Sequence, residues 1–255
     1  MTNIKAIIRA RMGSTRLPGK VLEIVCGKPL LLWQIERIQK CKLVDDIIVA
    51  TSNNPVDDEL INFCKVNNIN FFRGPENDVL NRVSQTIKKY NINLCAEFCG
   101  DSPLPDYKII DMYLSEFLEK INHYDFLTNA LQTSYPPGMD VVVYKSEILL
   151  DLDKRIPSDD PLREHCSYNI IRFSNKYNYK ILSKKAPKKN NFPDIHIEVD
   201  TKEDLILIKK IIAHFHDQKK DYFGLDEMLS FLNDNKNLLE INSKMFRKWK
   251  VFRGE

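Results

Sequence analysis

The feature that most constrains the fold lies at the start of the chain, where an apolar segment at residues 4–8 runs into a cationic loop at residues 9–20. The fixed positive charges of this loop are Arg9, Arg11, Arg16 and Lys20. Gly13 and Gly19 allow backbone turns that a side chain would obstruct, and a helix is expected from Pro29. A strand, a cationic glycine-containing loop and a helix are typical of an α/β protein that binds a polyphosphate, because loop N–H groups converge on its oxygens.

The same residues leave a second interpretation of the loop open. A run of charged residues is most often only a solvated surface. The loop also lacks the G-x-x-x-x-G-K-[ST] pattern of the ATPase phosphate loop, since Gly13 and Gly19 are six positions apart and Val21 follows Lys20. It contains no G-x-G-x-x-G either. Composition alone therefore does not decide between phosphate binding and a solvated loop.

Beyond the loop, helical and strand-like segments alternate, which indicates a parallel sheet with crossover helices. Helical spacing is present at residues 29–41, 57–66, 107–121, 145–155, 160–171, 201–214 and 225–232. Strand-like segments lie at residues 46–51, 69–72, 94–99, 125–129 and 195–200, and a further strand is expected after Asp140.

Composition excludes several classes of protein. The 255 residues include 38 basic and 35 acidic side chains, for a net charge of +3, which argues against a nucleic-acid-binding surface. No apolar run approaches the ~20 residues of a membrane span. The N-terminus leads directly into a strand, so we expect no signal peptide. The six cysteines form no Cys-x-x-Cys pair, which favours reduced thiols in a cytoplasmic protein over a zinc or disulfide framework.

Carboxylates lie where strands are expected to end. Asp101 follows one such strand, and the alternation of the last one places His196, Glu198 and Asp200 on a common face. Ligands gather outside the carboxyl ends of parallel strands, and Mg²⁺ prefers oxygen ligands, so these carboxylates suit a magnesium ion. The alternatives are a turn aspartate at Asp101 and a helix-dipole partner at Asp200, because residues 201–204 have the pattern of a capping box.

A second polar segment, residues 73–82, links a strand to the next helix. Asn77 or Asp78 is expected to cap that helix, and a capped helix start is by itself a sufficient explanation of the segment. Arg73, at the strand's carboxyl end, is the cation that we expect to contact a ligand. Arg82 lies further along the helix, and we expect it to be structural.

Four separated blocks of the chain resemble the cytidylyltransferase family, which includes the enzymes that make CMP-activated acidic sugars. The blocks are Arg11-Met-Gly-Ser-Thr-Arg-Leu-Pro-Gly-Lys20, Arg73-Gly-x-x-x-Asp-Val-Leu80, Gly100-Asp-x-Pro-Leu104 and Val199-Asp-Thr-x-Glu-Asp-Leu205. They occur in family order within residues 4–215. The nearest likeness is to the SpsF-like branch, which shares the Arg163-Glu164-His165 triplet. Arg9 departs from that branch's uncharged amide, and Val142 from an acidic residue common in related sequences.

The resemblance implies a three-layer α/β/α nucleotide-diphospho-sugar transferase (GT-A-like) fold with a mostly parallel central sheet. It implies a β-rich excursion near residues 130–185 within a catalytic domain at 1–216. Residues 217–255 are expected to form a C-terminal helical extension, whose basic, aromatic tail at 245–255 packs against a neighbouring segment or a dimer partner. The family likeness also suggests a homodimer.

The implied reaction is transfer of CMP from CTP to a sugar or sugar-like acceptor, with release of pyrophosphate, for surface polysaccharide synthesis and with Mg²⁺ as cofactor. The expected catalytic residues are Lys20, Arg11 and Asp101. The expected nucleotide contacts are Ala10, Arg11, Met12, Gly13, Ser14, Arg16, Lys20, Arg73 and Asp78. The expected acceptor contacts are Asp140, Arg163 and His165. The expected metal ligands are Asp101, Asp200 and Glu198.

Three other functions remain open at this point. A sugar-phosphate nucleotidyltransferase would use UTP or GTP, and a non-catalytic subunit would bind CTP without releasing pyrophosphate. A glycosyltransferase of similar fold typically needs Asp-x-Asp at its metal, which Asp101-Ser-Pro does not supply.

Overall fold

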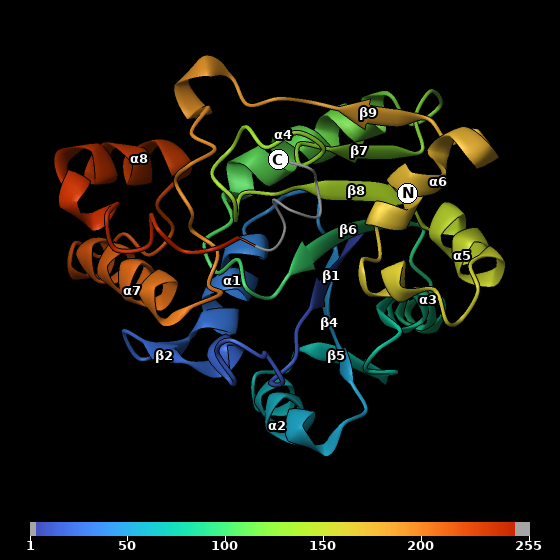
Figure 1. Ribbon diagram of the computed structural model, residues 1–255, viewed down its shortest axis with the longest axis horizontal. Helices are drawn as coiled ribbons and strands as arrows, with labels where there is room; N and C mark the ends of the chain where they lie inside the picture. The colour runs from blue at the N-terminus through green and yellow to red at the C-terminus, as the bar shows by residue number, and fades with distance from the viewer. Residues whose placement is uncertain (1–3, 248–255) are drawn as a thin grey trace.

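The computed structural model describes residues 4–247, which form a seven-stranded sheet with helices on both faces (Figure 1). In sheet order the strands are β5 (Asn70–Gly74), β4 (Asp46–Ser52), β1 (Ile4–Arg9), β6 (Leu94–Cys99), β8 (Val142–Lys145), β7 (Phe126–Thr128) and β9 (Ile181–Ser183). Among the described strands of this sheet, only β8 runs against its neighbours. The expected mostly parallel α/β fold is confirmed.

The helices form two layers around the sheet. One layer holds α1 (Leu30–Ile38), α2 (Asp58–Val66), α4 (Tyr107–Glu119), α7 (Lys202–Asp217) and α8 (Leu225–Asp234). The other holds α3 (Val79–Tyr90), α5 (Ser146–Arg155) and α6 (Tyr168–Tyr177). Because both faces of the sheet are covered, its central strands are apolar at nearly every position. None of the helices in residues 4–247 has the length and apolar character needed to cross a membrane.

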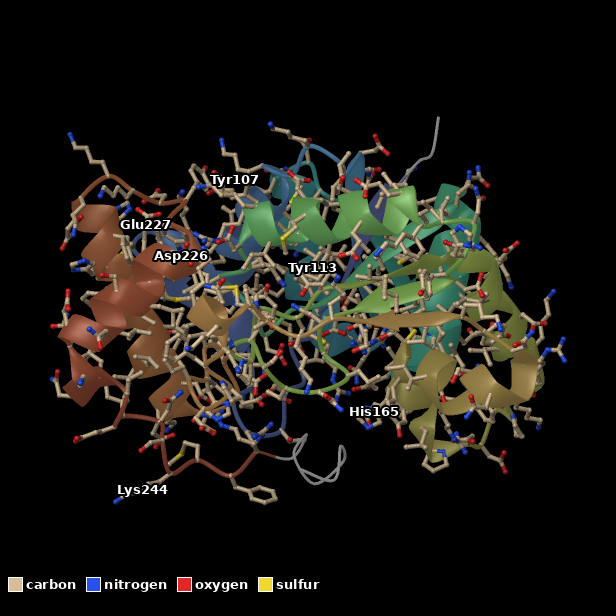
Figure 2. The ribbon with its side chains drawn as sticks, turned by 90° about the horizontal axis from the view of Figure 1, so that it is seen from above. Tyr107, Tyr113, His165, Asp226, Glu227 and Lys244 are labelled. Carbon is tan, nitrogen blue, oxygen red and sulfur yellow. The ribbon has the colours of Figure 1, made fainter. Side chains whose placement is uncertain are left out.

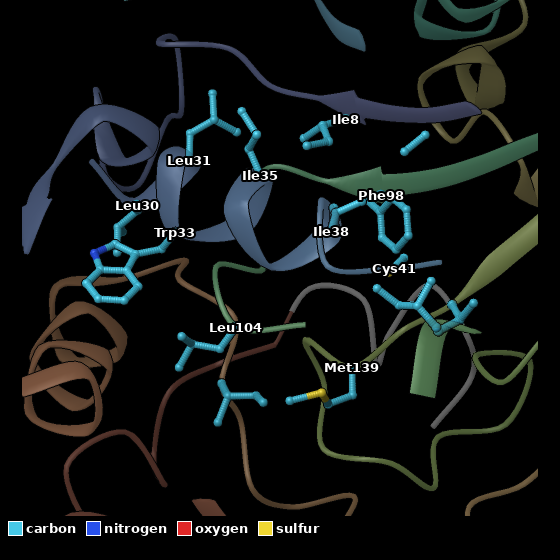
Figure 3. Close-up of a cluster of buried hydrophobic side chains, with 14 of the residues drawn as sticks. Ile8, Leu30, Leu31, Trp33, Ile35, Ile38, Cys41, Phe98, Leu104 and Met139 are labelled. Carbon is cyan, nitrogen blue, oxygen red and sulfur yellow. The ribbon is translucent and has the colours of Figure 1, made fainter. Parts of the chain in front are cut away.

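Alternation along β1 shows how the two layers are built. Ala6 and Ile8 pack in the core beneath α1, whereas Ile7 between them packs in the core beneath α3. Figure 3 shows Ile8 and Phe98 of the sheet facing the apolar side of α1. The two cores fix β1 and β6 in register, with Arg9 beside Cys99 at their carboxyl ends.

Two expected helix caps are present. The Asp78 side chain accepts a hydrogen bond from the Asn81 N–H at 2.9 Å and caps α3. Thr201 and Asp204 form a reciprocal capping box at the start of α7. Such caps satisfy backbone donors that the first helical turn leaves free.

The prediction of a strand at residues 195–200 is wrong. This segment has no regular secondary structure, and the N–H groups of Ile197 and Val199 donate to loop carbonyls, those of Pro137 and Asp101. Ile197 and Val199 are fully buried because the extended segment passes between loops, and this burial produces the alternation of a strand. His196 is also buried, so it does not share an exposed face with the two acids that follow.

Two further expectations need correction. The single helix expected at 160–171 is a short 3-10 turn, Pro161–Glu164, followed by α6 from Tyr168. The break is held by Asn169, whose side chain donates to the carbonyls of Leu162 and His165. The expected β-rich excursion at 130–185 is an α/β extension of the sheet, since it holds α5 and α6 besides the short strands β8 and β9.

The C-terminal segment joins the main core. Phe223, Leu225 and Met228 pack in the same apolar cluster as Ile8 of β1, and Figure 1 shows α7 and α8 adjacent to each other on one side of the sheet. Of the basic tail at 245–255, residues 248–255 lie outside the described part of the chain. Arg247 is buried against this chain's own Asp204.

Candidate active site

A cleft of about 830 Å³ opens at the carboxyl ends of β1 and β6. Its walls come from the loop after β1, the loop after β6, the segment before β8, the turn before α6 and the segment before α7. In Figure 2, His165 on this wall lies between the α6 side of the molecule and the C-terminal helices. Five segments far apart in the sequence therefore meet at the position where α/β proteins bind ligands.

The cationic loop is closed on itself by backbone hydrogen bonds. The carbonyl of Met12 accepts from the N–H groups of Ser14 and Gly19, each at 2.9 Å, and the Met12 N–H donates to Asp57 at 2.7 Å. Gly19 has φ +74°, in the left-handed region that favours glycine. The chain turns there into the short 3-10 helix Lys20–Leu22, which places Lys20 in the cleft.

Lys20 contacts acidic residues that lie far from it in the sequence. Its Nζ donates to the Val199 carbonyl at 2.6 Å and to Asp200 Oδ1 at 3.0 Å, and lies 3.6 Å from Asp101 Oδ2. Arg16 pairs with the other oxygen of Asp200 at 2.8 Å. Burial would lower the pKa of Lys20, but the two aspartates outweigh it and raise the pKa above its ordinary value, so the ammonium stays charged.

Asp101 is held in place by a close approach of two loops. A Cβ at Gly100 would lie 2.8 Å from the Cβ of Ala10 and 3.1 Å from the carbonyl oxygen of Arg9. The Gly100 N–H donates to that carbonyl at 2.9 Å, and the Asp101 carbonyl accepts from Val199 at 2.7 Å. A side chain at position 100 would collide with Arg9 and Ala10 and force the backbone next to Asp101 to shift, which explains the glycine.

The other side of the cleft holds an ion pair that the sequence did not suggest. Arg9 Nε lies 3.1 Å from Oε1 of Glu97, whose side chain is 1% exposed. The Tyr144 hydroxyl donates to Oε2 of Glu97 at 2.7 Å. A charged residue inside the apolar strand β6 was the available signal, because such a residue is seldom buried without a partner. Arg11 nearby lies 3.6 Å from Glu76 and 3.8 Å from Glu164.

Most of the predicted site residues line this cleft. They are Ala10, Arg11, Ser14, Arg16, Lys20, Asp101, Asp140, His165, Glu198 and Asp200. Burial lowers the pKa of His165, with Glu164 opposing and Arg9 adding to the shift, so its imidazole is neutral at pH 7. Arg82, expected to be only structural, also lines the cleft, while its Nη1 donates to two backbone carbonyls.

Other predicted contacts do not line the cleft. Arg73 donates to the carbonyls of Ser52 and Asn54 and pairs with Asp58, and Arg163 pairs with Asp78 and Asp153. These side chains hold loops together. Met12 and Gly13 shape the cationic loop without forming the cleft wall. The assignment of Arg73, Asp78, Arg163, Met12 and Gly13 as ligand contacts therefore stays a prediction that this geometry does not support.

The donor set fits a metal ion that arrives with its substrate. Oxygens of Asp101 and Asp200 both lie within 3.6 Å of Lys20 Nζ, so two carboxylates converge on one point, and Glu198 lines the same cleft. Within residues 4–247 no group of three or more His, Cys, Asp and Glu side chains is arranged to hold a metal. Mg²⁺ is commonly held by one or two carboxylates together with substrate phosphates. Asp101 and Asp200 can provide the carboxylates.

Comparison with known proteins decides the family. The chain matches the cytidylyltransferase family over residues 5–244. It belongs to that family. This cytidylyltransferase is thus an enzyme of the CTP-dependent nucleotidyltransferase type, and the resemblance found in its four sequence blocks is confirmed.

Individual relatives agree with this assignment. The cytidylyltransferase is 29% identical to the spore coat polysaccharide biosynthesis protein SpsF of Bacillus subtilis (strain 168), over 92% of this chain and 96% of the relative. A solved cytidylyltransferase from Leptospira borgpetersenii serovar Hardjo-bovis (strain JB197) is 28% identical, with a TM-score of 0.87 over 97% of this chain and all of that one. A CMP:2-keto-3-deoxy-manno-octonic acid synthetase complexed with CTP shares the fold, at 18% identity and a TM-score of 0.61 over 83% of this chain and 99% of that one.

Proposed function

We propose that this cytidylyltransferase transfers CMP from CTP to a sugar or sugar-like acid and releases pyrophosphate, for the synthesis of a surface polysaccharide. The observation that carries the proposal is the contact of Lys20 with Asp200 at 3.0 Å and Asp101 at 3.6 Å. It joins the cationic loop to two acidic loops in one cleft. The name of SpsF and the CTP complex of the octonic acid synthetase support the choice of nucleotide and pathway.

The mechanism follows from the charges on the cleft wall. CTP brings a highly anionic triphosphate, whose charge Arg11, Arg16 and Lys20 offset in the cleft. An acceptor oxygen attacks the α-phosphorus as the bond to the β-phosphate oxygen breaks, and pyrophosphate leaves with that electron pair. When bound by Asp101 and Asp200, Mg²⁺ supplies charge neutralisation at the phosphates. Most of the rate enhancement is positioning and electrostatics.

The acceptor is expected on the side of the cleft that holds Arg9, Asp140 and His165. A hydroxyl acceptor must lose a proton, and a neutral imidazole is able to accept one. His165 lines this side of the cleft, and burial lowers its pKa and so keeps its imidazole neutral; we therefore assign this proton to His165. A phosphate acceptor would need no base.

Several further properties belong to the same proposal. They are Mg²⁺ as the cofactor, a homodimer, a cytoplasmic location, and a division into a catalytic domain at 1–216 and a helical extension at 217–255. Sedimentation of the purified protein tests the homodimer, and titration of EDTA-treated protein with MgCl₂ tests the cofactor.

One experiment tests the reaction itself. Pyrophosphate release is measured with each of the four nucleoside triphosphates against a panel of acidic sugars and polyol phosphates. Release with CTP and an acidic sugar supports the proposal, and release only with UTP or GTP overturns it in favour of a sugar-phosphate nucleotidyltransferase. CTP binding without release with any acceptor indicates a non-catalytic subunit. Asp101→Asn, which removes one carboxylate from Lys20, is the matched inactive control.

A further inference from the structure

The segment that carries Glu198 and Asp200 lacks the support that a strand would give it. Residues 196–200 have no ladder partner. Their backbone is instead held by the Pro137 and Asp101 carbonyls and by the side chains of Lys20, Asn242 and Asp204. Of these side chains, Asp204 holds the backbone of Asp200 itself, because its Oδ2 accepts from the Asp200 N–H at 3.0 Å. The position of Asp200 therefore depends on what fixes Asp204.

Asp204 is fully buried and accepts several hydrogen bonds. Its Oδ2 takes the N–H groups of Asp200 and Thr201, at 3.0 and 2.9 Å. Arg247 binds the same carboxylate in a bidentate manner: Nη1 donates to Oδ2 at 3.0 Å and Nη2 donates to Oδ1 at 2.7 Å. A bidentate pair of this kind fixes orientation as well as charge. Burial would raise the pKa of Asp204, but Arg247 and Asn242 outweigh it and lower the pKa.

The other end of the acidic segment is held by the same part of the chain. Asn242 donates from Nδ2 to the His196 carbonyl at 3.0 Å and to Asp204 Oδ1 at 2.7 Å. Arg247 Nη2 also donates to the Asn242 carbonyl at 3.2 Å. Asn242 and Arg247 are 3% and 4% exposed. The C-terminal extension thus contacts the start of segment 196–200 directly, through Asn242, and its end indirectly, through Asp204.

We propose that Arg247 is a positioning residue, which acts through Asp204 to hold Asp200 where it meets Lys20 and Arg16. The inference rests on the proposed function of that site, since Asp200 matters to catalysis only if the cleft binds a nucleotide. On this proposal the C-terminal extension supports the active site from outside the cleft, since no described residue of the extension lines the cleft. Family blocks in the first 205 residues gave no indication of this role.

The test uses the full chain and compares Arg247→Lys, Arg247→Met and the control Lys244→Ala. Arg247→Lys keeps the buried positive charge but cannot form the two parallel hydrogen bonds to the Asp204 carboxylate. Lys244 is exposed on the same extension, and its side chain points away from the molecule (Figure 2). Turnover is measured at saturating CTP, at a temperature at which each variant is folded, so that lost stability does not count as lost activity.

We expect kcat to fall about tenfold or more in Arg247→Met with little change in the KM for CTP, because a small displacement of a catalytic group is costly. Arg247→Lys should recover part of the loss, and Lys244→Ala should match the unmodified enzyme. In an Asp204→Asn background, Arg247→Lys should have little further effect, since both changes act on one contact. Should Arg247→Met not fold, Arg247→Lys and Asn242→Ala are judged by the same criteria.

A second readout needs no catalysis. Amide hydrogen exchange at Asp200 and Thr201, measured without metal or nucleotide, should speed up about tenfold in Arg247→Lys relative to Lys244→Ala. Unchanged exchange together with turnover within about twofold of the unmodified enzyme would overturn the inference, even if the melting temperature falls, and would leave Arg247 as a stabilising residue only. If the unmodified enzyme releases no pyrophosphate with any substrate pair, the proposed function fails while exchange still decides the role of Arg247.

Discussion

The buried pair of Arg9 and Glu97 gives the sharpest prediction about stability. Arg9→Gln leaves the Glu97 carboxylate, 1% exposed, without its cation. Removing one partner of a buried ion pair typically costs ~3–5 kcal/mol. The Tyr144 hydroxyl still donates to Glu97 at 2.7 Å, and the Arg9 side chain is 20% exposed, so we expect the lower end of that range, about 3 kcal/mol.

Urea unfolding followed by circular dichroism measures this loss. For a chain of this size, about 3 kcal/mol corresponds to a fall in melting temperature of roughly 6–12 °C. The double variant Arg9→Gln/Glu97→Gln should recover most of the stability, since it leaves no charge unpaired.

A matched control lies two residues along the same loop. Arg11→Gln breaks ion pairs of 3.6 and 3.8 Å whose side chains are between 32% and 59% exposed. Exposed pairs contribute little, so its cost should stay below about 1 kcal/mol. Equal losses in Arg9→Gln and Arg11→Gln would refute the reasoning, because burial of the pair would then have no influence on its contribution.

Three further outcomes are expected. Lys20→Met should abolish pyrophosphate release and weaken CTP binding, measured by calorimetry, while the protein stays folded by circular dichroism, because it removes the charged ammonium from the cleft; turnover close to the unmodified enzyme would dismiss the cleft as the site. Gly100→Val should reduce kcat by about 100-fold, since its Cβ would lie 2.8 Å from that of Ala10 and would displace Asp101; kcat close to that of the unmodified enzyme would show that the close approach at Gly100 does not position Asp101. With a hydroxyl acceptor, kcat/KM should be constant between pH 7 and 8. It should fall as the pH drops below the lowered pKa of His165, because the imidazole becomes protonated and can no longer accept a proton. If a His165→Gln variant shows the same fall, another group causes the pH dependence.

Much of the sheet could be predicted because its signals are local. β1, β4 and β6 are mostly apolar runs, and Asp78 and Thr201 are cap residues at the expected helix starts. Such patterns reflect burial and backbone satisfaction within a few residues. The segment at 195–200 misled us because alternating burial arises equally when an extended chain passes between loops.

The site was predictable only in part, for a different reason. Lys20 and Asp101 follow from strand ends and charge, since parallel strands bring their carboxyl ends together, whereas Asp200 lines the cleft from an extended segment that is not a strand. Whether an arginine faces the cleft or a carbonyl depends on partners outside its own strand or helix, as for Arg73, which donates to the carbonyls of Ser52 and Asn54. Contacts of this kind leave no periodic trace: the charged residue inside β6 was a signal for the Glu97 pair but did not identify its partner, and nothing in the sequence indicated the proposed role of Arg247.

The contact of Lys20 with two aspartates has a consequence for the order of events at this enzyme. The Lys20 ammonium serves as an internal counter-ion for Asp101 and Asp200, so these two carboxylates have a positive charge beside them. A bare triphosphate entering there meets two carboxylates, and a bare divalent cation meets an ammonium. We expect the two together to exchange these partners, with Lys20 pairing with the phosphates and the aspartates with the cation, so the proposed substrate complex should suit the cleft better than either part alone.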